Sequence, residues 1–330
     1  MYRASEKRYE DIQYNRCGKS GLKLPVVSLG FWHNFGDTAN YENMKKMCFT
    51  AFDRGITHFD LANNYGPRPG SAEKNLGRIL REEMSAYRDE LIISTKAGFD
   101  MWQGPYGDHG SRKYLIASLD QSLRRLGLEY VDIFYHHRPD PDTPLEETMG
   151  ALDSIVKSGK ALYVGLSNYD GFLMEKACKI LDELKCPYVI NQNPYNILNR
   201  GIEFNGVKET SRKLGKGLIC FCPLAQGILT NRYIDGIQSD SRVMTDGRFL
   251  NKNSIQDDVL RKVRQLNELA SERGETLARM ALKWVLKDGD VTSVLIGASK
   301  SEQIIDDLGV QTGSPLCKEE LEAIDRICSE

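Results

Sequence analysis

The chain has 330 residues, of which 41% are hydrophobic and 27% are charged, and its formal net charge is −2. These values are typical of a globular protein, and they argue against a strongly basic surface for nucleic acid or for an anionic membrane. No apolar run is long enough to cross a bilayer, and the polar first residues lack a signal-peptide core. We therefore expect a cytoplasmic protein.

Eight cysteines are scattered along the chain without a C-x-x-C pair. Cys220 and Cys222 lie two apart on an expected strand, and therefore on one face. A structural zinc site would need further ligands, and no Cys/His cluster supplies them. We expect reduced thiols, as is usual in the cytoplasm, and no bound metal.

Strand-like and helix-like segments alternate along the chain. A turn-rich segment at residues 18–21 first joins two short strands, at 14–17 and 22–24, as a hairpin. Short apolar runs, typical of strands covered on both faces, then occur at residues 26–29, 56–60, 91–95, 131–136, 161–165, 188–192, 217–222 and 293–296. Helical apolar spacing occurs at residues 41–54, 71–83, 111–126, 144–158, 171–183, 204–214, 255–273 and 277–287, from residue 301, and at 318–328. Ser71 and Ser111 are the expected N-caps of two of these helices.

Eight strand–helix units predict a closed (β/α)8 TIM barrel, an α/β fold, as one domain over residues 1–330. The N-terminal β-hairpin and the last helices are additions to it. An open doubly wound sheet is the alternative. Such a sheet usually carries a G-x-G-x-x-G turn after its first strand if it binds a dinucleotide, and here Gly30 leads into Phe31 and Trp32 instead. A polar stretch at residues 231–253 is of the length that is usually functional or disordered.

Polar side chains follow the second, third and fourth strands. Asp60 and Tyr65 follow the second, Lys96 ends the third, and His136 and His137 end the fourth. In a barrel of parallel strands these ends meet at the catalytic face. A lysine there is a poor core residue, because an unpaired buried ammonium is costly, although it could simply reach water. Adjacent histidines on a strand point to opposite faces, so only one of them can enter the site.

These residues form a set suited to proton donation. Free tyrosine titrates near pH ~10, and we expect a nearby ammonium to lower that pKa. Asp60 would hold Lys96 charged and in place, Tyr65 could protonate an oxygen that gains negative charge, and the histidine could donate a hydrogen bond to the same oxygen. The pattern favours reduction of a carbonyl by an external hydride source. Taken alone, Asp60 and Tyr65 are equally consistent with a loop in which one caps and the other packs.

The later strand ends could bind the hydride source. Amide and hydroxyl side chains there suit a neutral carboxamide, and an aromatic residue could stack on a flat ring. The turns at residues 222–227 and 297–300 could offer backbone N–H groups to phosphate. The side chains concerned are Ser167, Asn168, Gln192 and Phe221. Each feature alone is common loop chemistry, but their order along the chain favours a bound cofactor.

Together these motifs resemble those of the aldo-keto reductase superfamily over nearly the whole chain. The resemblance is carried by Phe59-Asp60, Tyr65-Gly66, Ser71-Ala72-Glu73, Lys96, His137-Arg138-Pro139, residues 165–169, residues 192–196, residues 223–227 and residues 296–299. It implies a (β/α)8 barrel that binds extended NADPH without a Rossmann fold. It also implies Tyr65 as general acid, Asp60 and Lys96 as the groups that tune it, and His137 rather than His136 as the residue that orients the substrate.

The resemblance further implies an NADP(H) site. The nicotinamide end would contact Trp32, Asp60, Ser167, Asn168, Gln192 and Phe221. The pyrophosphate would lie along Cys222, Pro223, Leu224, Ala225, Gln226 and Gly227, with Arg232 and Arg242 as clamps. The adenosine end would contact Gly297, Ser299, Gln303, Asp306 and Asp307.

The adenosine end departs from the family pattern in two ways. Asp307 stands where the family usually has asparagine against the adenine. Ala298 and Gln303 stand where many members carry lysine and arginine for the 2′-phosphate, which leaves Lys300 or Arg242 for that contact. NADP is thus favoured over NAD on the remaining pattern.

Within the superfamily, residues 32–36, 62–67 and 111–114 most resemble bacterial L-glyceraldehyde 3-phosphate reductases, which are relatives of potassium-channel β subunits. This implies short aldehydes as substrates, including L-glyceraldehyde 3-phosphate and methylglyoxal, and a homo-oligomer, either a tetramer or an octamer. The implied substrate residues are Trp32, Tyr65, His137 and Arg138. Arg138 suits either a phosphate anchor or a structural ion pair. The alternative function is a cofactor-binding regulatory subunit of a membrane channel, in which asparagine typically replaces the histidine, so His137 favours catalysis.

Overall fold

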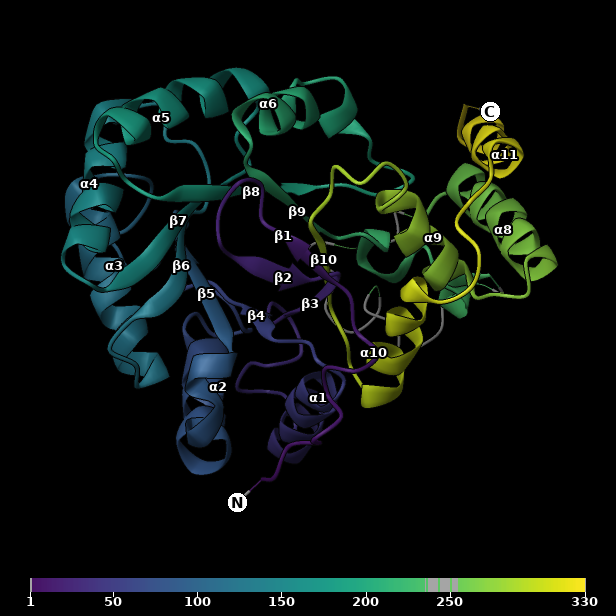
Figure 1. The fold of residues 1–330 in the computed structure, drawn as a ribbon, viewed down its shortest axis with the longest axis horizontal. Coiled ribbons are helices and arrows are strands. Elements are labelled where there is room, and N and C mark those ends of the chain that lie inside the picture. Colours follow the sequence, from purple (N-terminus) through teal and green to yellow (C-terminus); the bar gives the residue numbers. More distant parts are fainter. Residues whose placement is uncertain (1, 235, 237–242, 244–249, 251–254, 330) are drawn as a thin grey trace.

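The computed structural model describes residues 2–234, 236, 243, 250 and 255–329. Within these residues, eight parallel strands close a barrel in the order β10-β3-β4-β5-β6-β7-β8-β9, and helices surround it (Figure 1). The strands are β3 (Val27–Gly30), β4 (His58–Asp60), β5 (Ile92–Ala97), β6 (Val131–His136), β7 (Ala161–Ser167), β8 (Tyr188–Pro194), β9 (Gly217–Phe221) and β10 (Ser293–Ile296). The predicted TIM barrel is confirmed, and the open-sheet alternative is wrong.

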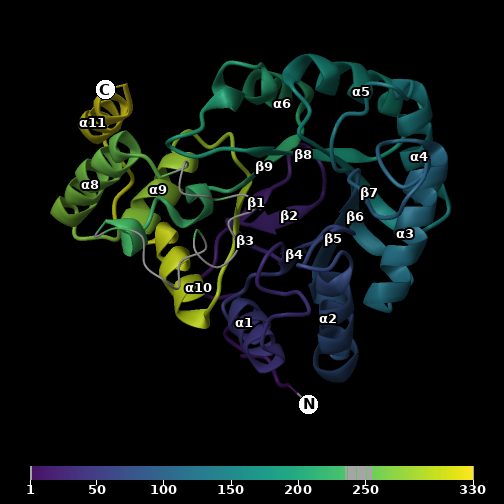
Figure 2. The ribbon, with the colours of Figure 1, turned by 180° about the vertical axis from the view of Figure 1, so that it is seen from behind.

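The α-helices of the described residues follow the predicted order. They are α1 (Tyr41–Asp53), α2 (Ser71–Ile79), α3 (Arg112–Leu126), α4 (Leu145–Lys157), α5 (Gly171–Glu183), α6 (Val207–Leu214), α8 (Asp257–Glu272), α9 (Leu277–Val285), α10 (Ser301–Leu308) and α11 (Lys318–Ser329). Helices α8, α9 and α11 lie together beside α10 at one side of the barrel in both views (Figures 1 and 2). None of the helices in the described ranges has the length and apolarity to span a bilayer.

Helix α2 differs from its prediction at both ends. Its cap position is Gly70, at a φ of 83°, and Ser71 is the first helical residue. The Ser71 hydroxyl donates to the Arg68 carbonyl oxygen (2.6 Å), so it serves the preceding loop and cannot cap the helix. At the other end, the regular helix stops at Ile79 and continues as a π-helical turn, Leu80–Met84. Ser111, in contrast, caps α3 as predicted.

Apolar residues pack on both sides of the barrel wall. A large cluster fills the layer between the strands and the surrounding helices. A smaller cluster lies inside the barrel and joins strand residues to the hairpin formed by β1 (Tyr14–Arg16) and β2 (Lys23–Pro25). The hairpin loop lies against the start of β8 and β9, because Cys17 Sγ donates to the Val189 carbonyl (3.4 Å) and Lys19 N donates to the Gly215 carbonyl (2.8 Å). The hairpin therefore closes the amino-terminal end of the barrel (Figure 1).

The interior of the barrel has two groups of side chains that are concentrated on different strands, although Leu295 of β10 belongs to the apolar cluster and Gln192 of β8 is polar and buried. The side formed by β10, β3, β4 and β5 carries buried polar residues, which we call the polar wall: Ser28, His58, Asp60, Ser94, Lys96 and Ser293. The side formed by β6, β8 and β9 carries buried residues of the inner cluster, which we call the apolar wall: Ile133, Tyr135, Ile190 and Ile219. Polar groups inside a core must find partners, so the polar wall is the place to look for a site.

Candidate active site

The four predicted catalytic residues meet at the carboxyl ends of β4, β5 and β6. The Lys96 ammonium donates to the Asp60 carboxylate and to the Leu61 carbonyl oxygen (2.8 Å), and it lies 3.4 Å from the Tyr65 hydroxyl. Asp60 and Lys96 are completely buried or nearly so. The rings of Tyr65 and His137 meet edge to face, with centroids 5.8 Å apart. The structure therefore brings together a carboxylate, an ammonium, a phenol and an imidazole.

The loop after β4 holds Tyr65 over this ion pair. Asn63 N donates to the Lys96 carbonyl (2.9 Å), which extends the pairing between β4 and β5 past the end of β4. The chain then turns at Gly66, whose φ of 96° is in the left-handed region. A Cβ atom there would lie 2.0 Å from Ser71 Oγ, so glycine is required on both counts. The tight turn returns the chain to α2 and leaves the Tyr65 side chain at the mouth.

Burial sets the ionisation of this group. It raises the pKa of Tyr65 well above the ordinary value, and the nearby Asp60 carboxylate raises it further. Burial also lowers the pKa of Lys96, while Asp60 opposes that change. The expected lowering of the Tyr65 pKa is therefore not found, because loss of hydration disfavours the phenolate and the negative charge of Asp60 disfavours it as well. Tyr65 is a phenol that keeps its proton at neutral pH.

The two adjacent histidines face different surroundings, as the strand alternation predicts. The His136 ring bonds through Nδ1 to the Tyr169 hydroxyl (2.7 Å), and burial lowers its pKa to about 4. The His137 ring packs against Tyr65 and, at 4.7 Å between centroids, against Phe99. Burial and the Lys96 charge hold the pKa of His137 well below its usual range, so the ring is neutral. Its Nδ1 has no hydrogen-bond partner within the described part of the chain.

The amides predicted for a carboxamide ligand adjoin the catalytic residues. Ser167 and Gln192 are partners in the register of β7 and β8, and Asn168 N donates to the Gln192 carbonyl (2.9 Å). The Asn168 amide nitrogen donates to the His137 carbonyl (2.9 Å), and that of Gln192 lies 3.4 Å from the Asp60 carboxylate. Asn168 has a φ of 62°, a left-handed conformation uncommon for a residue with a side chain. The structure thus places this polar group beside the proton donor.

The loop after β9 has an unusual backbone. Cys222, Ala225 and Gln226 have φ values of 52°, 47° and 60°, and Gly227 has a φ of 97°. Left-handed conformations are costly outside glycine and gather at functional sites, and turns of this kind direct backbone N–H groups toward anions. The Cys222 thiol is also close enough to Tyr65 to raise its pKa. This backbone fits a phosphate-bearing cofactor whose other end reaches the proton donor. Phe221 precedes the loop, and Pro223 and Leu224 lie within it.

The residues predicted for the adenosine end divide into two groups. Ser299 N and Oγ donate to the Gln303 side-chain oxygen (2.7 and 3.1 Å) in an exposed turn that includes Gly297. Asp306, in contrast, accepts from Arg279 (2.7 Å) and from Thr276 (3.0 Å), so it faces α9. The structure brings the first pair together and directs Asp306 away from them.

The remaining three residues predicted to bind the cofactor lie in different environments. Asp307 is buried, and burial together with the adjacent Asp306 raises its pKa to about 8. Arg232 lies in a 3-10 turn, Asn231–Tyr233, on the protein surface. Arg242 lies outside the described residues.

The two remaining substrate predictions border the catalytic group. The Trp32 carbonyl accepts from Gly66 N (3.2 Å), which places Trp32 beside the Tyr65 turn. The Arg138 guanidinium donates to both carboxylate oxygens of Asp108 (2.7 and 2.8 Å), and its Nε donates to the Gly98 carbonyl (2.7 Å). Of the two alternatives for Arg138, the structural ion pair is therefore present.

Two functional features escaped the sequence reasoning. Ser94 donates to the Asp60 carboxylate (2.6 Å), opposite the side that Lys96 occupies. Buried Glu73, which the sequence singled out only as part of the family motif, accepts from Thr95 (2.6 Å) and from Arg125 (2.6 Å), and its charge acts on Lys96. The two-residue spacing of Ser94 and Lys96 was a usable signal for the first, because it places both side chains on one face of β5.

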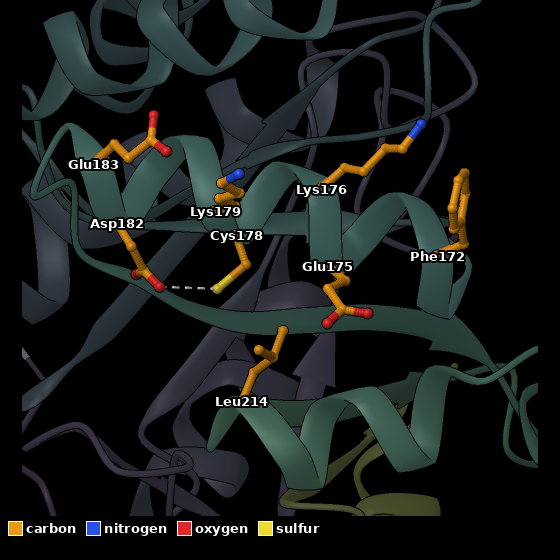
Figure 3. A pocket seen from close by; sticks show the side chains of 8 residues that line it. All are labelled: Phe172, Glu175, Lys176, Cys178, Lys179, Asp182, Glu183 and Leu214. Atoms are coloured by element: carbon orange, nitrogen blue, oxygen red, sulfur yellow. Dashed lines mark hydrogen bonds between the residues drawn. The ribbon is translucent and has the colours of Figure 1, made fainter.

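Three observations concern other kinds of site that this protein could have had. All eight cysteines are free thiols. In the described ranges, no group of three or more His, Cys, Asp or Glu residues is placed to hold a metal ion. A groove between α5 and α6 on the outside of the barrel is lined by residues such as Phe172, Glu175 and Leu214 (Figure 3), and none of the predicted site residues lines it.

Comparison with known proteins gives consistent matches. The model of the aldo/keto reductase family matches residues 26–329. An L-glyceraldehyde 3-phosphate reductase of Escherichia coli (strain K12) is 54% identical over 329 residues, which are 99% of this chain and 95% of that protein. Two probable voltage-gated potassium channel subunits beta are more distant. The Arabidopsis thaliana protein is 36% identical over 92% of this chain and 93% of its own, and the Oryza sativa subsp. japonica protein is 34% identical over 96% and 95%.

Proposed function

Because this chain belongs to the aldo/keto reductase family of oxidoreductases, we propose that it reduces short-chain aldehydes to alcohols with NADPH. The proposed substrates are L-glyceraldehyde 3-phosphate and methylglyoxal. The observation that carries the proposal is the contact of a protonated Tyr65 with the buried Lys96–Asp60 pair and with neutral His137. The 54% identity to the Escherichia coli reductase over nearly the whole chain supports the choice of phosphorylated substrate.

The proposed chemistry assigns each residue one task. When bound, NADPH supplies a hydride to the carbonyl carbon. Tyr65 gives its hydroxyl proton to the carbonyl oxygen as negative charge develops there, and it recovers a proton from water at the barrel mouth. Neutral His137 orients that oxygen, while Asp60 keeps the Lys96 ammonium directed at Tyr65. The high pKa of Tyr65 keeps the donor protonated before reaction.

The cofactor would lie across the second half of the barrel mouth. Ser167, Asn168 and Gln192 suit the nicotinamide amide, because they adjoin His137 and Asp60. The left-handed loop at residues 222–227 suits the diphosphate. Exposed Lys300, next to the Ser299 turn, is the proposed partner of the 2′-phosphate and the reason for preferring NADPH over NADH.

A second candidate function is a cofactor-binding regulatory subunit with little turnover. The identity of 34–36% to probable channel subunits beta is what favours it. The two functions separate on one question, which is whether bound NADPH is consumed.

The test is to follow loss of reduced-nicotinamide absorbance with L-glyceraldehyde 3-phosphate and with methylglyoxal, using NADPH and NADH in parallel. We expect turnover with both aldehydes, faster with NADPH and with the phosphorylated substrate. NADPH binding without turnover of either aldehyde would reject the reductase and support the regulatory subunit. Arg138→Ala, assayed on both aldehydes, tests the phosphate anchor. A rise of KM for the phosphorylated substrate alone would support it, and equal changes would leave only the ion pair to Asp108.

The proposal extends to the assembly of the protein. We take residues 1–330 as one cytoplasmic domain, since residues near the amino terminus pack on the barrel helices. Tyr2, for example, stacks on Phe49 with centroids 4.1 Å apart. We propose a homo-oligomer, either a tetramer or an octamer. Light scattering of the full chain tests this, and a monomer at micromolar concentration would contradict it.

A further inference from the structure

A chain of hydrogen bonds runs through the polar wall behind the catalytic ion pair. Ser293 Oγ lies 2.6 Å from Ser28 Oγ, and Ser28 Oγ lies 2.9 Å from His58 Nδ1. His58 Nε2 lies 2.9 Å from Ser94 Oγ, which lies 2.6 Å from the Asp60 carboxylate. The five side chains come from four adjacent strands, β10, β3, β4 and β5, and each is at most 1% exposed. The reaction proposed above assigns no task to His58 or to the serines.

The chemistry of Asp60 fixes the direction of every hydrogen bond in this chain. An ionised carboxylate only accepts, so the Ser94 hydroxyl donates to it. The Ser94 oxygen is then free to accept from His58, which places the imidazole proton on Nε2. His58 Nδ1 is left bare and accepts from Ser28, which in turn accepts from Ser293. All four hydrogens point toward Asp60, and bonds aligned in this way polarise and strengthen one another.

The surroundings of His58 keep it in this state. Burial and the Lys96 charge lower the pKa of the imidazole to about 4, against the opposing effect of Asp60. Asp60 on its own strand and Lys96 on β5 are the charged groups that act on it, and the neighbouring strands β3 and β10 present serines. The hairpin closes the amino-terminal end of the barrel, so the chain ends among buried groups. Because all five of its side chains are buried, the chain of hydrogen bonds is shielded from exchange with solvent donors and acceptors.

We propose that His58 is a positioning residue for the proton donor, which acts through Ser94 to keep the Asp60 carboxylate directed at Lys96. The direction of the hydrogen bonds is independent of any reaction, whereas the effect of His58 on turnover rests on the proposed reductase function. Burial lowers the pKa of Lys96, and the Asp60 carboxylate beside it opposes that change. If Asp60 lost the Ser94 hydrogen bond and turned away from Lys96, the ammonium beside Tyr65 would be lost at a lower pH.

The first test reads the imidazole of the ligand-free protein and needs no turnover. Nitrogen-15 NMR distinguishes the two neutral tautomers, and the His58 signals are assigned by their loss in His58→Gln. We expect the Nε2–H tautomer at neutral pH, with titration only near the pKa of about 4. An Nδ1–H tautomer, or titration near the ordinary value of about 6.5, would overturn the inference.

The second test uses Ser28→Ala, which removes the donor to His58 Nδ1 without touching Asp60, Lys96 or Tyr65. Loss of one buried hydrogen bond corresponds to a fall in kcat of about fivefold. We expect that fall with an unchanged NADPH dissociation constant, and a shift of the alkaline limb of the kcat–pH profile to lower pH. The matched control is Ser118→Ala, a buried serine on α3 outside the polar wall, which should leave that limb in place.

Variants at His58 complete the test. His58→Gln keeps one donor and one acceptor and should retain the alkaline limb, whereas His58→Leu should shift it. A wild-type limb in both Ser28→Ala and His58→Leu would overturn the positioning role, as would equal impairment of the two His58 variants. If the wild-type protein shows no reductase turnover, the proposed function fails, while the NMR experiment still decides whether the chain exists as inferred.

Discussion

The polar and apolar walls of the barrel interior are buried to the same degree but depend on different forces. On the apolar wall, Ile133 and Ile219 belong to the same inner cluster as residues of the hairpin, and packing supplies the stabilisation. On the polar wall, Lys96, Asp60 and Ser94 are stable only because each has a partner. The difference shows which buried positions can carry catalytic groups. A buried charge is available for function only if a neighbouring group holds it.

The comparison predicts that the two walls fail in different ways. A truncation on the apolar wall removes contacts and leaves a cavity, which lowers stability but leaves the charges in place. A truncation on the polar wall leaves a partner unpaired, which affects stability and chemistry together. The predictions below separate these outcomes, beginning with the largest expected effect.

Tyr65→Phe removes the proton donor while keeping the ring that packs against His137. We expect turnover to fall by about 10³-fold or more, because a positioned general acid contributes on that order. The free energy of unfolding and the NADPH dissociation constant should change little, since Lys96 keeps its bond to Asp60. Single-turnover kinetics with a parallel fluorescence titration of NADPH provide the measurement. Wild-type turnover would remove Tyr65 from the mechanism.

Lys96→Met leaves the Asp60 carboxylate buried without its cation. We expect the free energy of unfolding to fall by about 3–5 kcal/mol, as when one partner of a buried ion pair is removed. Urea denaturation measures this change. The double variant that adds Asp60→Asn has no orphan charge and should recover part of the loss. A double variant as unstable as the single one would show that side-chain packing, and not the Lys96–Asp60 ion pair, stabilises the polar wall.

Ile219→Ala is the matching change on the apolar wall. The side chain is fully buried in the inner cluster, so we expect a loss of about 2–4 kcal/mol in the free energy of unfolding. Here kcat should stay within about twofold of the wild type, because the inner cluster to which Ile219 belongs includes none of the four catalytic residues. Measuring stability and kcat on the same preparation decides the point. A large fall in kcat would mean that the walls are coupled.

Acidification should weaken the protein through its buried histidines. Burial lowers the pKa of His58 and of His136 to about 4, and it holds the pKa of His137 well below its ordinary value. Between the ordinary value near ~6.5 and about pH 4 the unfolded chain therefore binds more protons than the native protein, so stability is lost as pH falls. Each histidine contributes a slope of about 1.4 kcal/mol per pH unit.

The polar wall can be singled out in the same pH series. His58→Gln removes one titrating group from it, so the slope of unfolding free energy against pH should decrease by one histidine's contribution. A substitution at His136, which bonds to Tyr169 outside the catalytic group, should remove an equal contribution without moving the alkaline limb of kcat. Denaturation at several pH values, for wild type and both variants, provides the measurement. An unchanged slope in His58→Gln would contradict the low pKa of that ring.

Much of the molecule was readable from its sequence. Apolar runs followed by helical spacing predicted the barrel, because parallel strands covered on both faces have no polar alternation. The positions of Asp60, Tyr65, Lys96 and His137 at successive strand ends predicted their meeting, which the structure shows. These predictions depend only on the order of strands and helices, and hydrophobic periodicity indicates that order.

The other features depend on which groups lie next to each residue in the folded protein, and the sequence pattern does not show this. The pKa of Tyr65 is raised by burial and by the Asp60 charge, and the extent of burial cannot be judged from residue spacing. Ser71 has the right type and position for a cap, but the Arg68 carbonyl takes its hydroxyl. Likewise, the sequence allows Arg138 to bind a substrate phosphate or to form a structural ion pair, and only the fold shows that Asp108 lies beside it.

The hairpin that closes the barrel has a consequence for synthesis on the ribosome. Asn15 donates through its amide to the Thr292 carbonyl (2.9 Å), and Lys19 and Cys17 contact Gly215 and Val189. The hairpin is therefore translated well before these three partners. At roughly 5–20 residues per second, the chain between Asn15 and Thr292 takes about 15–55 seconds to make. During that interval the apolar hairpin residues have no barrel to close, so the hairpin is among the last segments to reach all of its native contacts.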